Sequence, residues 1–357
     1  MIRKGLIWFR TDLRLDDNPA LIAALGACEE VLALYFFSDY QWEAHNESNI
    51  KHEFLINNLT SLKESLEKLN IPLIAINTKS YKTLPEDLSS FSSQQKIDHV
   101  FWNNEFGLNE SERDSASKEA LQKINIQSSS FNDQVVYEPG FLITGQGKPF
   151  SVFTPFKRRW IENFDMNFLD IVKPSKAKKS SGIKSDISDL NFNKTHSANL
   201  NLWPAGESAA QKNLEHFLQS KAKFYSESRN SPILDGTSKI SPYLSLGILS
   251  PKRCILEGLK LNNFEFTSGN KGICKWIDEI VWREFYRNIM FSFPKVSKNQ
   301  PFQDYTRSIN WRHSSEELEA FYTGRTGFPI VDAGIRQMLA EGWMHNRLRM
   351  VVAMFFT

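Results

Sequence analysis

The chain has 357 residues, enough for about two domains at roughly 150 residues each. Its 43 Lys and Arg residues nearly balance its 41 Asp and Glu residues, so a nucleic-acid site has to be a local positive patch. Three widely separated cysteines and seven histidines without ligand spacing argue against a disulfide framework and against a metal site. No signal peptide and no apolar run of about 18 residues is present, so we expect a cytoplasmic protein without a membrane partner.

The first third of the chain alternates short apolar runs with helical patterns. Each run is rich in β-branched or aromatic residues, which predicts buried strands at Gly5–Phe9, Val31–Phe37, Pro72–Ile76 and His99–Trp102. Leucines at helical spacing predict a helix over 50–69, and a second helix is expected from Asn109, as its N-cap, to Ile124. Strand–helix repetition predicts an α/β domain with a doubly wound parallel sheet. The first strand is not followed by a Gly-x-Gly-x-x-Gly sequence, which disfavours a Rossmann-type dinucleotide site.

The remainder of the chain has a different character. Residues 173–201 are rich in Ser, Lys and Asn and predict a long exposed linker. From about Ser208 strand patterns vanish, and we expect an all-α region with helices at Ala209–Phe224, Ser250–Leu261, Gly272–Phe291, Ser315–Thr323 and Ile330–Ala340, and another from near His345. The expected organisation is an α/β domain over 1–135, an interdomain linker over 136–205 and a helical domain over 206–357.

Residues 278–287 hold the densest mixture of acid, base and aromatic side chains. On a helix, Glu279, Trp282 and Arg283 share one face. One interpretation is a salt bridge beside a core tryptophan, and the other is a pocket wall that stacks on a heterocycle and hydrogen-bonds to it.

Two further segments have patterns that suit an anionic ligand. Asn346, Arg347 and Met350 fall on one side of a helix start, and Arg349 points elsewhere, which indicates either an anion or heteroaromatic site or a solvated basic turn. The segment 235–241 places a glycine before hydroxyl side chains, as in a phosphate-binding loop, although such clusters also serve as ordinary caps. Residues 148–179 carry an excess of positive charge, which predicts either a track for DNA phosphate or a solvated surface.

Taken together, these segments resemble the DNA photolyase/cryptochrome family, and most closely bacterial class I cyclobutane-pyrimidine-dimer (deoxyribodipyrimidine) photolyases. The resemblance rests on the motifs at 6–15, 17–21, 153–157, 282–287, 326–333 and 343–350, which occur in the family's order. It implies an N-terminal α/β antenna-chromophore domain and a C-terminal all-α domain that binds FAD. The function implied is light-driven repair of pyrimidine dimers in DNA by electron transfer from excited reduced FAD, a carbon–carbon lyase reaction.

The resemblance also implies roles for individual residues. By residue match, the FAD contacts are Tyr225, Thr237, Ser238, Ile240, Ser241 and Arg349. The residues matched to the flavin border, the flipped dimer and DNA are Arg229, Glu279, Trp282, Arg283, Asn346, Arg347 and Met350, and Trp311 matches the surface end of the family's electron-transfer chain. The antenna, expected to be methenyltetrahydrofolate, is matched by His45, Asn109, Glu110 and Lys298.

Physical chemistry makes these assignments coherent. An extruded dimer needs a stacking surface, which Trp282 offers, and a hydrogen-bond partner for a pyrimidine carbonyl, which Glu279 offers. The rival interpretations are a cryptochrome-type blue-light signalling flavoprotein and an inactive photolyase fragment. The partner is expected to be dimer-containing DNA, bound by a monomer.

The last helical pattern runs to Thr357 without a cap, and family members continue for more than a hundred residues beyond this point. We therefore expect a C-terminally truncated flavin domain, in which Glu279, Trp282 and Arg349 meet at a half-open cavity. Arg349 should then lack a carboxylate partner, the apolar side chains of Val351, Met354 and Phe355 should be exposed, and FAD binding and repair should be weak.

Overall fold

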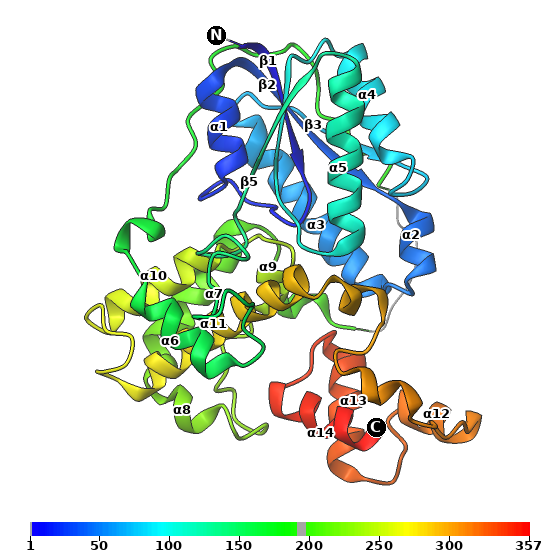
Figure 1. Ribbon diagram of the computed structural model, residues 1–357, viewed down its shortest axis with the longest axis vertical. Coiled ribbons are helices and arrows are strands. Elements are labelled where there is room, and N and C mark those ends of the chain that lie inside the picture. The colour runs from blue at the N-terminus through cyan, green and yellow to red at the C-terminus, as the bar shows by residue number, and fades with distance from the viewer. Residues whose placement is uncertain (1, 191–197) are drawn as a thin grey trace.

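The computed structural model describes residues 2–190 and 198–357, which form an α/β part and a helical part (Figure 1). The α/β part is built on a parallel five-stranded sheet of order β3-β2-β1-β4-β5. Its strands are β1 (Ile2–Phe9), β2 (Cys28–Phe37), β3 (Leu73–Asn77), β4 (His99–Asn103) and β5 (Gln127–Phe131).

The four strands expected from apolar runs are present, but the edge strand β5 was not predicted. Four of its five residues, Gln127–Ser130, are polar, so no apolar run marks them. Pairing with β4 fixes this segment as a strand, with Val100 opposite Ser128 and Trp102 opposite Ser130. This edge strand pairs with one neighbour only and none of its five residues is buried, so polar side chains are tolerated here.

Five helices accompany the sheet: α1 (Pro19–Ala27), α2 (Asp39–Ala44), α3 (Asn49–Glu67), α4 (Leu84–Gln94) and α5 (Leu108–Lys123). One core joins Ile7 and Phe9 of β1 to α1 and α3, and a second joins Leu6 and Trp8 of the same strand to α4 and α5. Helices therefore cover the sheet on both faces, as expected for a doubly wound sheet. The expected N-cap of α5 was wrong, because the cap is Gly107 and Asn109 is the second residue inside the helix.

The segment between the two parts contains α6 (Phe153–Glu162) and a 3₁₀ turn, η1 (Met166–Leu169). Part of the expected linker lies along the free edge of β3, where Asp186 donates to Leu73 and accepts from Ala75 through backbone hydrogen bonds of 2.9 and 2.8 Å. This stretch thus protects a sheet edge as well as connecting the parts. Residues 191–197 of the expected linker lie outside the described residues.

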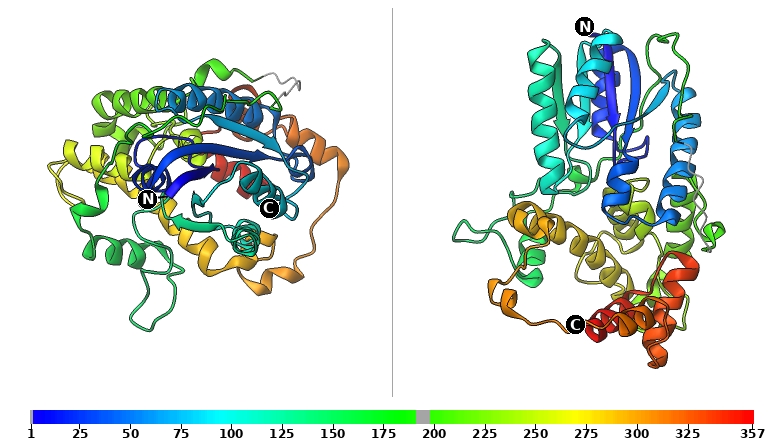
Figure 2. Two further views of the ribbon diagram at one scale, coloured as in Figure 1. Left: turned by 90° about the horizontal axis from the view of Figure 1, so that it is seen from above. Right: turned by 90° about the vertical axis from the view of Figure 1, so that its right-hand side faces the viewer.

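The helical part follows a short 3₁₀ turn, η2 (Leu200–Leu202). Its helices and turns are α7 (Glu207–Ser220), η3 (Ala222–Phe224), α8 (Tyr225–Ser228), α9 (Ser241–Ser245), α10 (Pro251–Leu261), α11 (Lys271–Ser292), η4 (Pro294–Lys298), η5 (Asp304–Ser308), α12 (Ser315–Tyr322), α13 (Pro329–Glu341) and α14 (Asn346–Phe356). The last three helices gather at the end of the molecule opposite the N-terminus (Figure 2). The helix expected over 209–224 ends at Ser220, and a 3₁₀ turn follows it.

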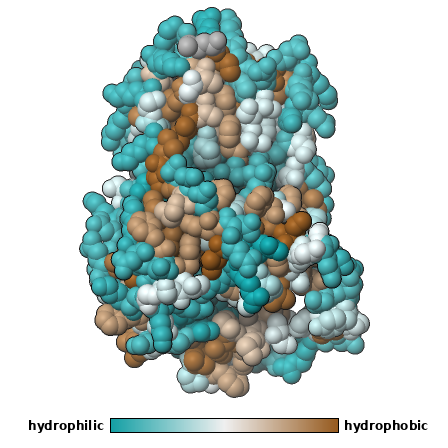
Figure 3. Space-filling model, turned by 60° about the vertical axis from the view of Figure 1, so that its left-hand side comes forward, coloured by the Kyte–Doolittle hydropathy of each residue, from teal (hydrophilic) through white to brown (hydrophobic). Residues whose placement is uncertain are grey.

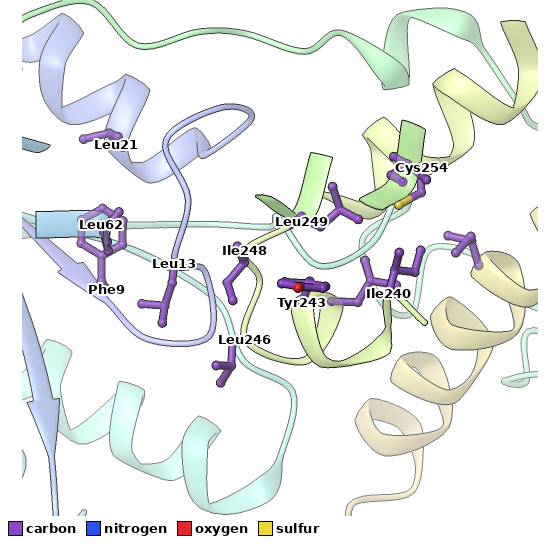
Figure 4. Close-up of a cluster of buried hydrophobic side chains, with 14 of the residues drawn as sticks. Phe9, Leu13, Leu21, Leu62, Ile240, Tyr243, Leu246, Ile248, Leu249 and Cys254 are labelled. Carbon is purple, nitrogen blue, oxygen red and sulfur yellow. The ribbon is translucent and has the colours of Figure 1, made fainter. Parts of the chain in front are cut away.

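One hydrophobic cluster runs through both parts. Phe9 and Leu13 on the sheet side lie near Tyr243, Leu246 and Ile248 of the helical part (Figure 4). Gly247 has φ +65°, and a Cβ at this position would lie 2.0 Å from the carbonyl oxygen of Thr11. Both the positive φ and this close approach require glycine where the two parts meet.

Helix α11 lies at the centre of the helical part. Its buried Glu284 accepts hydrogen bonds from the backbone NH groups of Val136 and Tyr137 and from the indole NH of Trp160 in α6. The helix that carries the candidate site is thereby tied to the segment that leaves the α/β part. No helix among residues 2–190 and 198–357 is long and apolar enough to cross a membrane.

Candidate functional site

Two acidic residues near the middle of α11 form ion pairs with neighbouring helices. Asp278 lies 2.6 Å from the ammonium of Lys157 in α6. Glu279 pairs with Arg229, which directly follows α8, and lies 3.7 Å from Lys275 one turn earlier. Both carboxylates are partly exposed, so this charged row lies at the protein surface.

Trp282, one turn beyond Glu279, lies in an aromatic cluster. Its ring is nearly parallel to that of Phe153 at the start of α6, with centroids 3.7 Å apart and 10° between the planes. Tyr286 stacks nearby at 5.6 Å, and Phe285 meets the indole edge-on. The indole remains partly exposed, so it offers a stacking surface beside a carboxylate.

Arg283 does not face the same surface as Trp282. Its guanidinium donates to the backbone carbonyls of Gln134 and Leu244, where the connecting segment meets α9. Burial, aided by the nearby Arg287, lowers the pKa of Arg283 to about 10. Two of its nitrogens therefore donate inside the protein, and the expectation that Arg283 contacts DNA stays a prediction.

A second basic group, on α14, binds the residue that follows Arg229. The guanidinium of Arg347 donates to the side-chain oxygen of Asn230 at 2.7 and 3.0 Å, directly beside Arg229. Its other amino group lies 3.6 Å from the sulfur of Met350. The structure thus brings Arg229, Glu279, Arg347 and Met350 together, with exposed Asn346 at the adjoining helix start.

The residues matched to FAD are divided between a cavity and its surroundings. Ser241 and Arg349 border a cavity of about 370 Å³ together with Trp203 and Trp343. Thr237 and Ser238 lie in the loop that leads to α9. Tyr225 is buried beside Arg229, and burial and Glu279 raise its pKa to about 12.

Ile240 differs from the other matched residues. Its side chain is 3% exposed within the main core, so only its backbone is available to a cofactor. Glu279 and Trp282 were expected to converge with Arg349 on one cavity. That expectation is wrong for this cavity, because Arg349 lines it and Glu279 and Trp282 do not.

The unused donors near this cavity suit a flavin nucleotide. Arg349 uses its Nε to donate to the carbonyl of Met344 and makes no ion pair within the described residues. His345 is not among the residues that line this cavity, but it lies two residues after Trp343, which does; it is 2% exposed, and its Nε2 has no hydrogen-bond partner in that same part of the chain. Guanidinium, imidazole and hydroxyl groups are the donors that a diphosphate and a ribityl chain require.

A separate cleft opens at the carboxyl ends of the strands. A cavity of about 360 Å³ is bordered by His45, Asn109 and Glu110. An adjoining cavity shares His45 and Asn109 with this one and is also lined by Glu112. Lys298 lies 3.5 Å from Glu112, at the edge of the cleft that the two cavities form. The four residues matched to an antenna therefore gather at one cleft.

The floor of this cleft is a charged layer that the sequence analysis did not identify. Arg10 and Arg113 lie over the ring of Trp8, at 4.5 and 5.0 Å from its centroid, and Arg113 pairs with Glu105. Burial would raise the pKa of Glu105, but Arg113 and Arg10 outweigh it and lower the pKa to about 2. Arg10 directly follows β1 and Glu105 is the second residue after β4, so their place at strand carboxyl ends was the available signal.

Two other expectations concern exposed residues. Trp311 is 53% exposed in the segment between η5 and α12, a surface position. Of the three apolar side chains expected to be exposed on α14, Met354 and Phe355 are 77% and 40% exposed, whereas Val351 is partly buried against the cluster that α13 and α14 share. The side of the molecule shown in Figure 3 also carries apolar side chains between polar ones over the helical part.

Within the described residues, no group of three His, Cys, Asp or Glu could hold a metal ion.

Comparison with known proteins agrees with this arrangement. The DNA photolyase model matches residues 5–178, and the model for the FAD binding domain of DNA photolyase matches residues 276–357. Deoxyribodipyrimidine photo-lyases of Salmonella typhimurium and Escherichia coli are each 36% identical over 352 residues, or 98% of this chain and 74% of theirs.

A solved structure shows the same likeness in three dimensions. The bacterial class III photolyase from Agrobacterium tumefaciens has a TM-score of 0.87 at 30% identity, over 99% of this chain and 72% of its own. A Synechocystis cryptochrome, 24% identical with a TM-score of 0.81, shares the fold over 99% of this chain and 75% of its own. On these grounds the chain belongs to the DNA photolyase family.

Proposed function

We propose that this protein repairs cyclobutane pyrimidine dimers in DNA by light-driven electron transfer from reduced FAD. The observation that carries the proposal is the surface row of Glu279 and Trp282 on α11, flanked by Arg229 and Arg347. A stacking ring, a carboxylate and two guanidinium groups on one surface suit a base extruded from a phosphate backbone.

Each of these side chains has a distinct task. The indole of Trp282 stacks on the extruded pyrimidine, which is sequence-tolerant because every base has a π face. The carboxylate of Glu279 accepts a hydrogen bond from a base NH, and in its protonated form donates one to a pyrimidine carbonyl. Arg229 and Arg347 lie beside these groups and bind phosphates, which fixes the register of the duplex without reading its sequence.

FAD, held by Arg349, Ser241 and the loop with Thr237 and Ser238, supplies light absorption and one-electron donation. Tyr225, whose ring lies 5.4 Å below the guanidinium of Arg229, is proposed as a further contact of the cofactor. The unused donors of Arg349, which lines the cavity, support this placement. The helical domain that performs this task extends, in our proposal, over 206–357, and the segment 136–205 connects it to the antenna domain over 1–135.

The cleft bordered by His45, Asn109 and Glu110 is the proposed antenna site. Methenyltetrahydrofolate carries a fused heterocycle and a glutamate tail, which Lys298 at the edge of the cleft can pair with. Trp311, at the surface, is proposed as the outer end of an electron-transfer route to the flavin.

The test is an assay of dimer reversal with the full chain, a duplex containing one thymine dimer, added FAD and a reductant. Reversal that requires both light and FAD, and that is lost in a Glu279→Gln, Trp282→Ala variant, supports the proposal. A protein that binds FAD but has equal affinity for damaged and undamaged duplex contradicts it and favours a signalling flavoprotein.

A further inference from the structure

The contact between α6 and α11 has a regular geometry at the candidate DNA surface. Phe153 and Lys157 lie four residues apart on α6, and Asp278 and Trp282 lie four residues apart on α11. The first ring stacks on Trp282 at 3.7 Å, and the lysine ammonium lies 2.6 Å from Asp278. One antiparallel helix pair is thus held at two points, one aromatic and one ionic.

Contacts other than the one with Trp282 also fix the position of Phe153. Its ring also meets Phe285 edge-on at 5.9 Å, and Phe156, in the next turn of α6, is fully buried. Further along the same helix, Trp160 donates to Glu284, which lies only two residues after Trp282. Three successive contacts therefore tie α6 to the helix that carries the stacking tryptophan.

This geometry distinguishes two roles for Phe153. A ring that only occupied the place of an absent base would have to move away freely when DNA binds. Phe153 instead begins a helix whose Phe156 and Trp160 are fully buried, and moving it would break the stacking and edge contacts together. A fixed ring parallel to an indole restricts the tilt of that indole.

We infer that Phe153 is a positioning residue: it holds the indole of Trp282 in the orientation that stacks on an extruded pyrimidine. The inference rests on the proposed function, because it takes Trp282 to stack on an extruded pyrimidine. The contact between Phe153 and Trp282 does not depend on that function. It also gives Lys157 a structural task, because the ion pair of this lysine with Asp278 joins the same two helices.

The experiment compares the full-length wild-type chain with Phe153→Ala, Phe153→Leu and Phe153→Tyr variants. The first measurement is acrylamide quenching of Trp282 without DNA, isolated as the fluorescence difference from a matched Trp282→Phe partner of each protein. We expect quenching to rise in the Ala and Leu variants and to stay at the wild-type level in Phe153→Tyr, which retains a ring. Leucine keeps most of the volume, so it preserves the measurement if the alanine variant does not fold.

The second measurement is the ratio of affinities for a duplex with one thymine dimer and the same duplex undamaged. We expect the ratio to fall roughly fivefold to tenfold in the Ala and Leu variants, the low end of the range for a stacked base. Undamaged binding should stay constant, and Phe153→Tyr should retain the wild-type ratio. The control is Phe264→Ala, which removes a ring that is 53% exposed in the loop after α10.

Two results would overturn the inference. A higher affinity for the damaged duplex in Phe153→Ala would show that this ring occupies the place of the base. Unchanged quenching of Trp282 in both the Ala and Leu variants would show that Phe153 does not hold the indole. If wild-type protein fails to distinguish the two duplexes, the proposed function fails, while the quenching comparison still decides whether Phe153 positions Trp282.

Discussion

The guanidinium of Arg14 lies 2.8 Å from the carboxylate of Asp133, and both side chains are only 1% exposed. Arg14 also donates to the backbone carbonyls of Gly247, Asp16 and Asp17. This single side chain therefore joins the first strand's loop, the segment after β5 and the helical part. It lies within the 6–15 motif, so that motif acts here as the connection between the two parts.

Arg14→Met should destabilise the protein strongly. The change leaves the carboxylate of Asp133 buried without its partner, which costs about 3–5 kcal/mol. The measurement is the free energy of unfolding in urea, with the exposed Arg325→Met as the matched control. A loss as small as that of the control would contradict the connecting role of Arg14.

Stability should fall as pH rises from about 5 to 8, because burial raises the pKa of Glu207 to about 7. The raised pKa means that the folded state binds more protons than the unfolded state between the ordinary glutamate pKa of 4.5 and about 7. The contribution of Glu207 is thus present at low pH and lost as pH rises, by up to about 3 kcal/mol. Burial likewise raises the pKa of Glu284 to about 7, so the contribution of Glu284 to stability is also lost as pH rises.

The measurement is urea unfolding at several pH values for wild type and Glu207→Gln. Glutamine does not titrate, and its one side-chain oxygen can still accept from the backbone NH of either Leu15 or Asp16. The variant should lose part of the decline between pH 5 and 8. An identical pH dependence in the two proteins would show that Glu207 titrates alike in the folded and unfolded states.

The sequence predicted most of the fold because its signals are local. Apolar runs identified β1 to β4, and helical spacing identified α3, α10 and α11 nearly to their ends. The polar edge strand β5 gave no such signal, since its structure depends on pairing with β4. The N-cap of α5 was predicted wrongly because asparagine is a favoured capping residue, whereas the helix already begins at Leu108, directly after Gly107.

The candidate site was predicted less evenly. Glu279, Trp282, Arg229 and Arg347 are brought together, although they come from three segments that only tertiary packing joins. Arg283 was misplaced because helical spacing cannot tell which of two neighbouring faces packs against Gln134 and Leu244. Phe153 was missed as a partner of Trp282 because its contact is non-local.

Arg347→Ala should weaken binding to damaged and undamaged DNA alike. Loss of one phosphate contact should lower the slope of log affinity against log salt by about 1. The measurement is a salt titration of binding to both duplexes. Arg325→Ala, which removes an exposed arginine near Glu319, should leave the slope unchanged. Equal slopes for wild type and Arg347→Ala would show that Arg347 does not contact phosphate.

His45→Ala and Glu110→Ala should each reduce binding of methenyltetrahydrofolate, because both side chains border the same cleft. The measurement is the near-ultraviolet absorbance retained by the protein after incubation with the folate and gel filtration. Glu119→Ala, an exposed position on the same helix as Glu110, is the control. Retention equal to that of wild type in both variants would rule out this cleft as the folate site.

The most direct test of lesion recognition at α11 is a competition measurement with the full chain and added FAD. The affinity for a duplex with one thymine dimer is compared with that for the same duplex undamaged, in wild type and in Trp282→Ala. We predict a clear preference for the damaged duplex that falls about 5- to 100-fold in the variant, the range for loss of one stacked base. A wild-type preference that survives the loss of Trp282 unchanged would contradict lesion recognition at this surface.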